Sequence, residues 1–169
     1  MIIEVEGDIL FTQADVIAHG IAANDPMSEG LAKSLHDVFP SMHKAFHKWC
    51  HQTHPKPGDA WIWGDKKANG IRVVNLITQD GGYGKGARPE KATVKNVSHA
   101  LRALKKLIQQ ENIKSVALPQ LATGVGGLLW SDIKPLIKQQ LEDLDIPVYV
   151  YSHFKPGKRA IEPRAAKLA

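Results

Sequence analysis

Short apolar runs of four to eight residues alternate with longer amphipathic stretches along the chain. Several runs are rich in β-branched residues, and turn-forming residues such as Gly7 and Gly64 follow them. Runs of this length and composition are typical of buried strands. Strands are therefore predicted at residues 2–5, 16–22, 60–63, 71–78, 115–118 and 147–152.

The amphipathic stretches repeat apolar residues every three or four positions. Leu31, Leu35 and Phe39 follow an i, i+4, i+8 spacing, with the capping-type residue Ser28 ahead of them and Pro40 after them. Strands that alternate with helices predict an α/β domain, in which helices cover both faces of a largely parallel sheet. Helices are predicted at residues 28–40, 41–51, 90–108 and 131–144.

The composition fits one soluble domain. The chain has 169 residues, of which 43% are hydrophobic and 23% charged, and this is enough to bury one core. Its longest segment without a charged residue has 17 residues and contains Pro119 and Gln120, so no membrane span is expected. The first residues lack the pattern of a signal peptide, and Cys50 is the single cysteine. A reducing, cytoplasmic location is therefore expected.

The formal charge of +5 is concentrated at the end of the chain. Residues 154–169 carry five basic residues and Glu162, a net charge of +4, which leaves +1 for residues 1–153. We expect this basic tail to be disordered or to make an accessory contact. The nearly neutral body weakens the hypothesis of a nucleic-acid binder, which rests on the tail alone.

Ala122-Thr123-Gly124-Val125-Gly126-Gly127 links a predicted strand to a predicted helix. Glycines at such a place let backbone N–H groups approach phosphate oxygens. The spacing matches neither a Walker A loop nor a dinucleotide fingerprint. From the pattern alone, a tight strand-to-helix turn without a ligand is the favoured interpretation.

Three segments together resemble the macro domain family. They are Val5-Glu6-Gly7-Asp8-Ile9-Leu10, Ala18-His19-Gly20-Ile21-Ala22 ahead of Gly30-Leu31-Ala32, and the stretch from Pro119 to Trp130. The likeness spans roughly residues 2–153. It is greatest to the branch with terminal ADP-ribose protein glycohydrolase, antitoxins acting on ADP-ribosylated DNA, and the yeast ADP-ribose 1''-phosphate phosphatase. The resemblance implies a macro domain at 1–153 and a basic C-terminal tail at 154–169. The implied fold is a three-layer α/β/α sandwich around a mixed, mostly parallel sheet of about six strands.

The resemblance also implies a site for ADP-ribose or a related nucleotide. Asp8 would accept a hydrogen bond from the adenine amino group and Ile9 would pack on the ring, although Asp8 could instead cap a helix. Tyr151 would flank the adenine, or be a core aromatic. The implied ligand-binding residues are Asp8, Ile9, Ala22, Asn24, Ser28, Gly30, Leu31, Gln120, Leu121, Ala122, Thr123, Gly124, Val125, Gly126, Tyr151 and His153.

The groups that carry catalysis in related branches are missing. In the glycohydrolase branch a lysine follows the strand and an aspartate lies in the glycine loop, but this chain has Gln79 and Gly126 there. An amide cannot form an imine with a sugar aldehyde, and glycine exchanges no proton. Another macro branch uses an aspartate where Ala32 stands. Lys85 could reach back from its glycine-rich loop, but a solvated lysine is the simpler interpretation.

His19 is the candidate catalytic residue that remains. The phosphatase-like branch also lacks the lysine and has a histidine at this place. Such a histidine could act as acid, base or nucleophile on a terminal phosphate, with Asn24, Asp25 and Glu29 as candidate partners. The alternative is a core histidine bonded to its surroundings. Whether the chain is an enzyme stays open at this point.

His43, His47 and His51 repeat at helical spacing, with Cys50 and His54 beside them. Histidines one turn apart can chelate zinc. Lysines interleave with them and no acidic residue lies in the segment, so a polar helix surface is favoured and neither a metal nor a cofactor is expected.

Three hypotheses therefore remain. The first is an ADP-ribose-binding hydrolase, phosphatase-like or acting on ADP-ribosyl linkages, whose substrate could be an ADP-ribosylated macromolecule. The second is a non-catalytic reader or sequestering module for ADP-ribose or a nucleotide signal, and the third is a nucleic-acid binder. Specificity is expected in the loops at 24–29 and 79–89, and their sequence does not identify the linkage.

Overall fold

The computed structural model describes residues 1–65, 70–81 and 88–163. Six strands form one sheet in the order β1-β6-β5-β2-β4-β3. All neighbouring pairs are parallel except β3 and β4, which are antiparallel. The prediction of a mixed, mostly parallel six-stranded sheet is confirmed. The strands are β1 (Ile2–Gly7), β2 (Val16–Ala22), β3 (Ala60–Trp63), β4 (Arg72–Gln79), β5 (Val116–Leu118) and β6 (Val148–Phe154).

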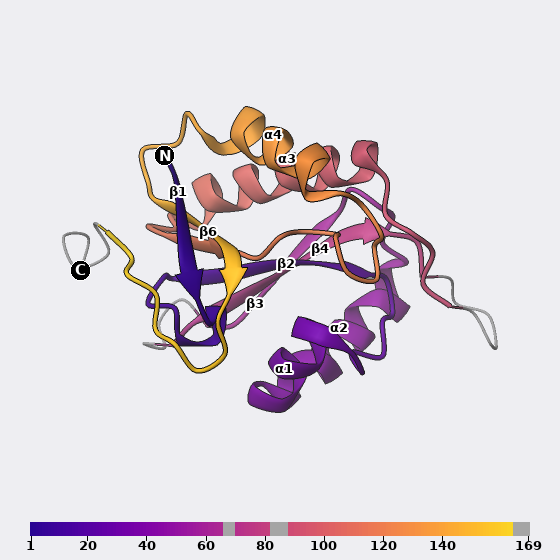
Figure 1. The fold of residues 1–169 in the computed structure, drawn as a ribbon. Helices are drawn as coiled ribbons and strands as arrows, with labels where there is room; N and C mark the ends of the chain where they lie inside the picture. Colours follow the sequence, from indigo (N-terminus) through magenta and orange to yellow (C-terminus); the bar gives the residue numbers. More distant parts are fainter. Residues whose placement is uncertain (66–69, 82–87, 164–169) are drawn as a thin grey trace.

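Helices cover both faces of the sheet, as Figure 1 shows. One hydrophobic core joins the sheet to α3 (Val94–Gln110) and α4 (Trp130–Leu141). A second core, on the other face, includes residues of α1 (Gly30–Val38) and α2 (Pro40–Thr53). The short 3-10 helix η1 (Ile9–Phe11) follows β1. The predicted three-layer α/β/α sandwich is confirmed.

Two helices begin later than predicted. The helix expected from residue 90 begins at Val94, because the Thr93 side chain accepts the N–H of Asn96 and caps it. The helix expected from residue 28 begins at Gly30. Ser28 does not cap it, since Glu29 is the N-cap residue and makes no side-chain cap hydrogen bond.

The residues after β6 turn back onto the body of the domain. Residues 155–163, here called the C-terminal strap, make backbone hydrogen bonds to Gly7 and Asp8, and Tyr149 donates a hydrogen bond to Pro163 O at 2.6 Å. Disorder was therefore a wrong expectation for these residues, and the accessory contact is what the structure has. Residues 164–169 lie outside the described part of the chain.

Within the described residues, no helix combines the length and the apolar character needed to cross a membrane.

Candidate functional site

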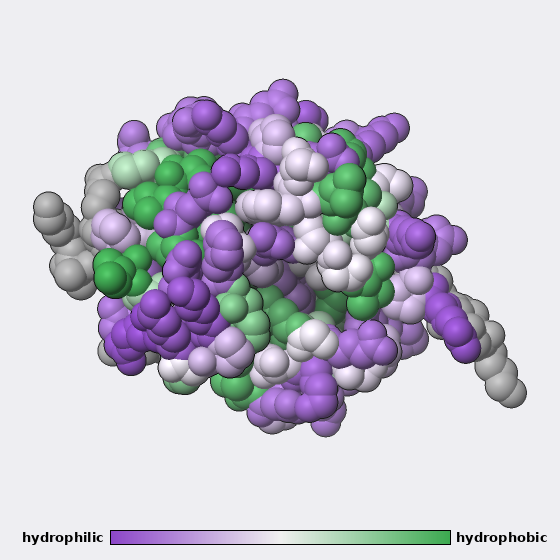
Figure 2. Space-filling model, in the orientation of Figure 1, coloured by the Kyte–Doolittle hydropathy of each residue, from purple (hydrophilic) through white to green (hydrophobic). Residues whose placement is uncertain are grey.

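A cleft of about 540 Å³ lies at the carboxyl end of β2, β4 and β5. Ligands of parallel α/β sheets commonly bind at this edge, where loops leave the strands. Figure 2 shows the molecule with a hollow near the centre of the view, above α1 and α2. The predicted site residues that line the cleft are His19, Ser28, Gly30, Leu31, Gln120, Leu121, Ala122, Gly124, Val125 and Gly126.

The remaining predicted residues do not line this cleft. Ala22 ends β2 next to it, and Asn24 and Thr123 belong to the two loops that border it. Asp8 caps η1, Ile9 belongs to η1, and Tyr151 and His153 belong to β6; all four lie outside the cleft lining.

The glycine loop at 122–127 forms one wall of the cleft. It is folded on itself, because Gly127 N donates to Gly124 O at 3.0 Å and Leu128 N to Ala122 O at 2.9 Å. A methyl group added at Gly124 would meet no atom within 4 Å. The Cα of Gly124 therefore has open space on the side where a side chain would stand. The segment is a tight turn and also lines the cleft, so the tight-turn interpretation does not exclude a ligand at this loop.

Gly126 cannot carry a side chain in this loop conformation. A Cβ there would lie 2.7 Å from Ala122 O, a backbone atom that has little freedom to move. The loop is held to the segment just before α3 by a further hydrogen bond, in which Ala92 N donates to Gly126 O. Close backbone packing thus explains the glycine where the glycohydrolase branch has an aspartate.

The loop at 23–29 lies across the cleft from the glycine loop and is held by hydrogen bonds to α2. His47 Nε2 donates a hydrogen bond to Asp25 O at 2.8 Å, and Asn24 N donates to Cys50 Sγ at 3.3 Å. The buried Met27 anchors the loop in the core, and its N–H donates to Asp25 Oδ1 at 2.7 Å. Burial raises the pKa of the Asp25 carboxyl. The cleft thus contains a carboxyl whose charged form is disfavoured by burial.

His19 lines the cleft but is only 2% exposed. Its Nε2 lies 2.5 Å from Asn75 Oδ1 on the neighbouring strand, and Asn75 Nδ2 in turn approaches Met42 Sδ at 3.5 Å. Burial lowers the pKa of His19 to about 4, against the smaller opposing effect of the Asn75 hydrogen bond. At neutral pH the imidazole is uncharged. The neutral imidazole can accept a proton as a general base, but it is not protonated and so cannot start a reaction as a general acid.

Besides Asp25, three polar side chains line the cleft that the sequence prediction did not include among the ligand-binding residues. Gln79, 4% exposed, ends β4 at the floor, while Glu29 and Arg88 are exposed at the rim. The signal for Arg88 was its place in the loop after a strand of the site, a loop that was expected to set specificity. Ala32 also lines the cleft. Lys85 lies outside the described residues.

The residues at the adenine end that the resemblance implies are largely buried and hydrogen-bonded within the protein. Asp8 is 8% exposed, and its two carboxylate oxygens accept the N–H groups of Leu10 and Gly157 at 3.0 and 2.9 Å. It is also the N-cap of η1, so the capping alternative is correct in geometry. Tyr151 is 5% exposed and donates to Glu162 Oε2 at 2.8 Å. Its ring is a core aromatic here, and His153 is exposed.

The histidines of α2 pack with a histidine of α1. The rings of His36 and His43 stack with centroids 4.0 Å apart, and those of His43 and His47 lie 4.3 Å apart. Across residues 1–65, 70–81 and 88–163, no three His, Cys, Asp or Glu side chains are grouped so that they could hold a metal ion. The contact of His47 with the 23–29 loop gives this cluster a structural role beside the cleft.

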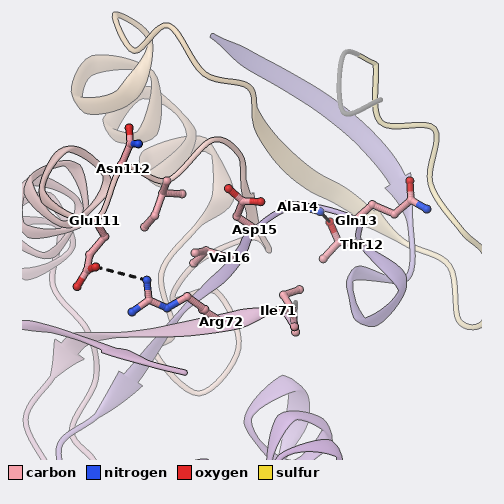
Figure 3. Close-up of a pocket in the computed structure, with 11 residues that line it drawn as sticks. Thr12, Gln13, Ala14, Asp15, Val16, Ile71, Arg72, Glu111 and Asn112 are labelled. Atoms are coloured by element: carbon pink, nitrogen blue, oxygen red, sulfur yellow. Dashed lines mark hydrogen bonds and ion pairs between the residues drawn. The ribbon is translucent and has the colours of Figure 1, made fainter. Parts of the chain in front are cut away.

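A second cavity of about 500 Å³ lies at the opposite edge of the sheet, where β2 and β4 begin (Figure 3). Arg72 Nη1 contacts Glu111 Oε2 at 3.5 Å across it, and Arg72 Nε donates to Gly64 O. Asp15 accepts the N–H of Lys114. These polar groups are engaged in holding the strand starts and the end of α3, so the cavity is structural in character.

Known proteins match the chain over most of its length. A DNA ADP-ribosyl glycohydrolase of Mycobacterium tuberculosis is 28% identical over 166 residues, which are 96% of this chain and 45% of that protein. The chain spans 40–45% of the length of four such bacterial relatives. The solved macrodomain of Thermus aquaticus DarG has a TM-score of 0.79 at 25% identity and covers 90% of this chain and 98% of its own.

A third comparison agrees in fold. The structure of Thermosipho africanus DarTG in complex with ADP-ribose has a TM-score of 0.78 at 23% identity, and the match covers 97% of this chain and 44% of that one. The sequence model described as Macro domain matches residues 21–137, which include the end of β2, the glycine loop and most of α4. The chain therefore belongs to the macro domain family.

Proposed function

We propose that the cleft binds ADP-ribose, or the ADP-ribose part of a larger molecule, and that the domain hydrolyses a bond to the distal end of this ligand. The observation that carries the proposal is the placement of the glycine loop opposite the start of α1, both lining one cleft. Backbone N–H groups at a helix start and in a glycine loop stabilise a diphosphate without requiring basic side chains. This suits a domain whose first 153 residues carry a net charge of only +1.

The ligand-binding roles follow the geometry. Gly124 and Val125 on one side and Gly30 and Leu31 on the other would hold the two phosphates, and the distal ribose would extend toward Gln79 and the 23–29 loop. Asp8 lies outside the cleft lining, and its role of receiving the adenine amino group is taken from the resemblance to macro domains. Support also comes from the relatives, because the Thermosipho africanus protein was solved with ADP-ribose and the Mycobacterium tuberculosis relative is a glycohydrolase of ADP-ribosylated DNA.

Hydrolysis would have to proceed without a lysine nucleophile at position 79. Water would form the new bond to the distal ribose or to a phosphate on it, and the leaving group would take a proton. Asp25, a carboxyl in the cleft whose pKa is raised by burial, and the neutral His19 would move that proton. Both an ADP-ribose 1''-phosphate and an ADP-ribosylated macromolecule fit this chemistry.

A non-catalytic reader is the second candidate. The observation in its favour is that Gln79, Gly126 and Ala32 replace the catalytic groups of related branches. Nucleic-acid binding through the tail has less support, because the strap packs on the domain and Lys155 is paired with Glu6 at 2.7 Å. A cytoplasmic location is consistent with the single, buried Cys50 and stays part of the proposal.

Calorimetric titration with ADP-ribose tests the binding claim, and absence of heat at high-micromolar protein would refute it. Product formation is then measured on ADP-ribose 1''-phosphate and on an ADP-ribosylated DNA oligonucleotide. Release of phosphate or of ADP-ribose, decreased by at least tenfold in Asp25→Asn with ADP-ribose binding retained, supports a hydrolase. Binding without product from either substrate would assign the chain to the readers.

A further inference from the structure

The C-terminal strap (residues 155–163) lies against the end of the site where Asp8 is found. Asp8 N donates to Lys158 O at 2.7 Å, and Gly157 N donates to Asp8 Oδ2 at 2.9 Å. The strap therefore holds both the backbone and the side chain of Asp8. A carboxylate fixed by two backbone N–H groups, those of Gly157 and Leu10, has its orientation defined before any ligand arrives.

The close approach of the strap depends on Gly7. A Cβ at Gly7 would lie 2.8 Å from both Ala160 N and Lys158 O. β1 thus ends in a residue that lets the strap pass directly over the backbone beside Asp8. The first residue of the strap also extends the backbone pairing of β6 with β1, because Lys155 N donates to Gly7 O at 3.0 Å.

Glu162 fastens the far end of the strap. Its carboxylate accepts Thr12 Oγ1–H at 2.5 Å, Gln13 N–H at 2.8 Å and the Tyr151 hydroxyl at 2.8 Å. Glu162 is the one acidic residue after position 153 in the sequence, and it is half-buried between η1 and β6. Charge-assisted hydrogen bonds to three donors are stronger than neutral ones. Burial and the neighbouring carboxylate raise the pKa of the Tyr151 hydroxyl, so it stays a donor.

We infer that Glu162 is a positioning residue for base recognition: it fastens the strap, and the strap orients the Asp8 carboxylate toward the amino group of a purine. The inference rests on the proposed function, in which Asp8 receives the adenine amino group. Each Asp8 oxygen retains lone-pair capacity beyond its backbone contact. Loosening the strap should therefore reduce the preference for a base with an amino group more than it reduces binding of the diphosphate and riboses.

The test compares ADP-ribose with its inosine analogue, which carries a carbonyl oxygen where adenine has the amino group. Calorimetry is performed on the full chain, on Glu162→Ala, and on Ile161→Ser as a control, since Ile161 is 86% exposed in the same strap. The wild type and Ile161→Ser should bind ADP-ribose at least tenfold more tightly than the analogue. In Glu162→Ala the affinity for ADP-ribose should fall about tenfold and that for the analogue less than twofold.

The ratio of the two affinities separates positioning from a merely structural role. An equal loss for both ligands, an unchanged ratio, or tighter binding of ADP-ribose by Glu162→Ala would overturn the inference. Binding of neither ligand by the wild type would refute the proposed function itself, and the inference with it. If Glu162→Ala does not fold, Tyr151→Phe removes one donor to Glu162 and keeps the ring; its ratio should also decrease, and Glu162→Gln should retain more of it than Glu162→Ala.

Discussion

His19 Nε2 and Asn75 Oδ1 meet at 2.5 Å across the parallel pair β2 and β4. The pair lies between the sheet and α2, in a region where both residues are almost inaccessible. Because burial disfavours the imidazolium, the pKa of His19 is lowered to about 4 in the folded protein. His19 must take up a proton on unfolding at mildly acidic pH, and this gives a direct prediction for stability.

The free energy of unfolding should decrease as the pH falls from about 6.5 to about 4. The folded pKa lies below the unfolded value, so the contribution of His19 is fully present above pH 6.5 and is lost at lower pH. The full effect is about 3 kcal/mol by the usual 1.36 kcal/mol per pKa unit. Urea unfolding at several pH values measures it. His19→Asn should show a shallower decrease over the same interval, and an identical slope in both proteins would contradict the assigned pKa.

Two glycines of the same loop should respond differently to alanine. Gly126→Ala should destabilise the domain by about 1–3 kcal/mol, because its Cβ would overlap the carbonyl of Ala122. Gly124→Ala should be neutral or stabilising by up to about 1 kcal/mol, because its Cβ would meet nothing within 4 Å. Thermal unfolding of both variants measures the difference. Equal effects would mean that the loop does not hold the conformation described.

Gln79→Lys tests whether the floor of the cleft is positioned as in lysine-dependent macro domains. The side chain at this position is 4% exposed, so an amine there would be desolvated and more readily neutral. We expect borohydride in the presence of ADP-ribose to give a covalent adduct at residue 79, because the amine and the open ribose aldehyde lose water to an imine that hydride reduces. Mass spectrometry should find the adduct in Gln79→Lys and not in the wild type. Without an adduct, the floor would be out of reach of the ribose carbon.

The sequence predicts the parts of this domain that depend on local pattern. Apolar runs indicate every strand of the sheet, and the glycine loop stands out because strand, glycines and helix are consecutive. Pattern reasoning places the start of α3 too early, because the Thr93 cap is a single side-chain hydrogen bond that periodicity does not register. The position of Asn75 opposite His19 requires the strand register, which becomes known only when the sheet is assembled.

The particular contacts of the strap could not be predicted for a similar reason. Glu162 and Thr12 are 150 positions apart, and no periodic signal joins them. A charged, proline-containing tail is also typical of disordered segments. The one signal in the sequence was Glu162, the lone acidic residue among five basic ones in the tail. Such a carboxylate can fix the tail when the folded domain presents donors to it.

Arg88 and Arg159 provide a final test of where the ligand binds. Arg88 lines the cleft beside the glycine loop, whereas Arg159 is exposed on the strap. Arg88→Gln should weaken ADP-ribose binding about three- to tenfold and reduce its dependence on salt concentration, because an exposed guanidinium near a diphosphate acts through a screened charge. Arg159→Gln removes the same charge from the chain and should leave the affinity unchanged within twofold. Calorimetry of both variants at low and at physiological salt distinguishes the two positions. A loss in Arg159→Gln equal to that in Arg88→Gln would mean that overall positive charge, and not the cleft, governs binding.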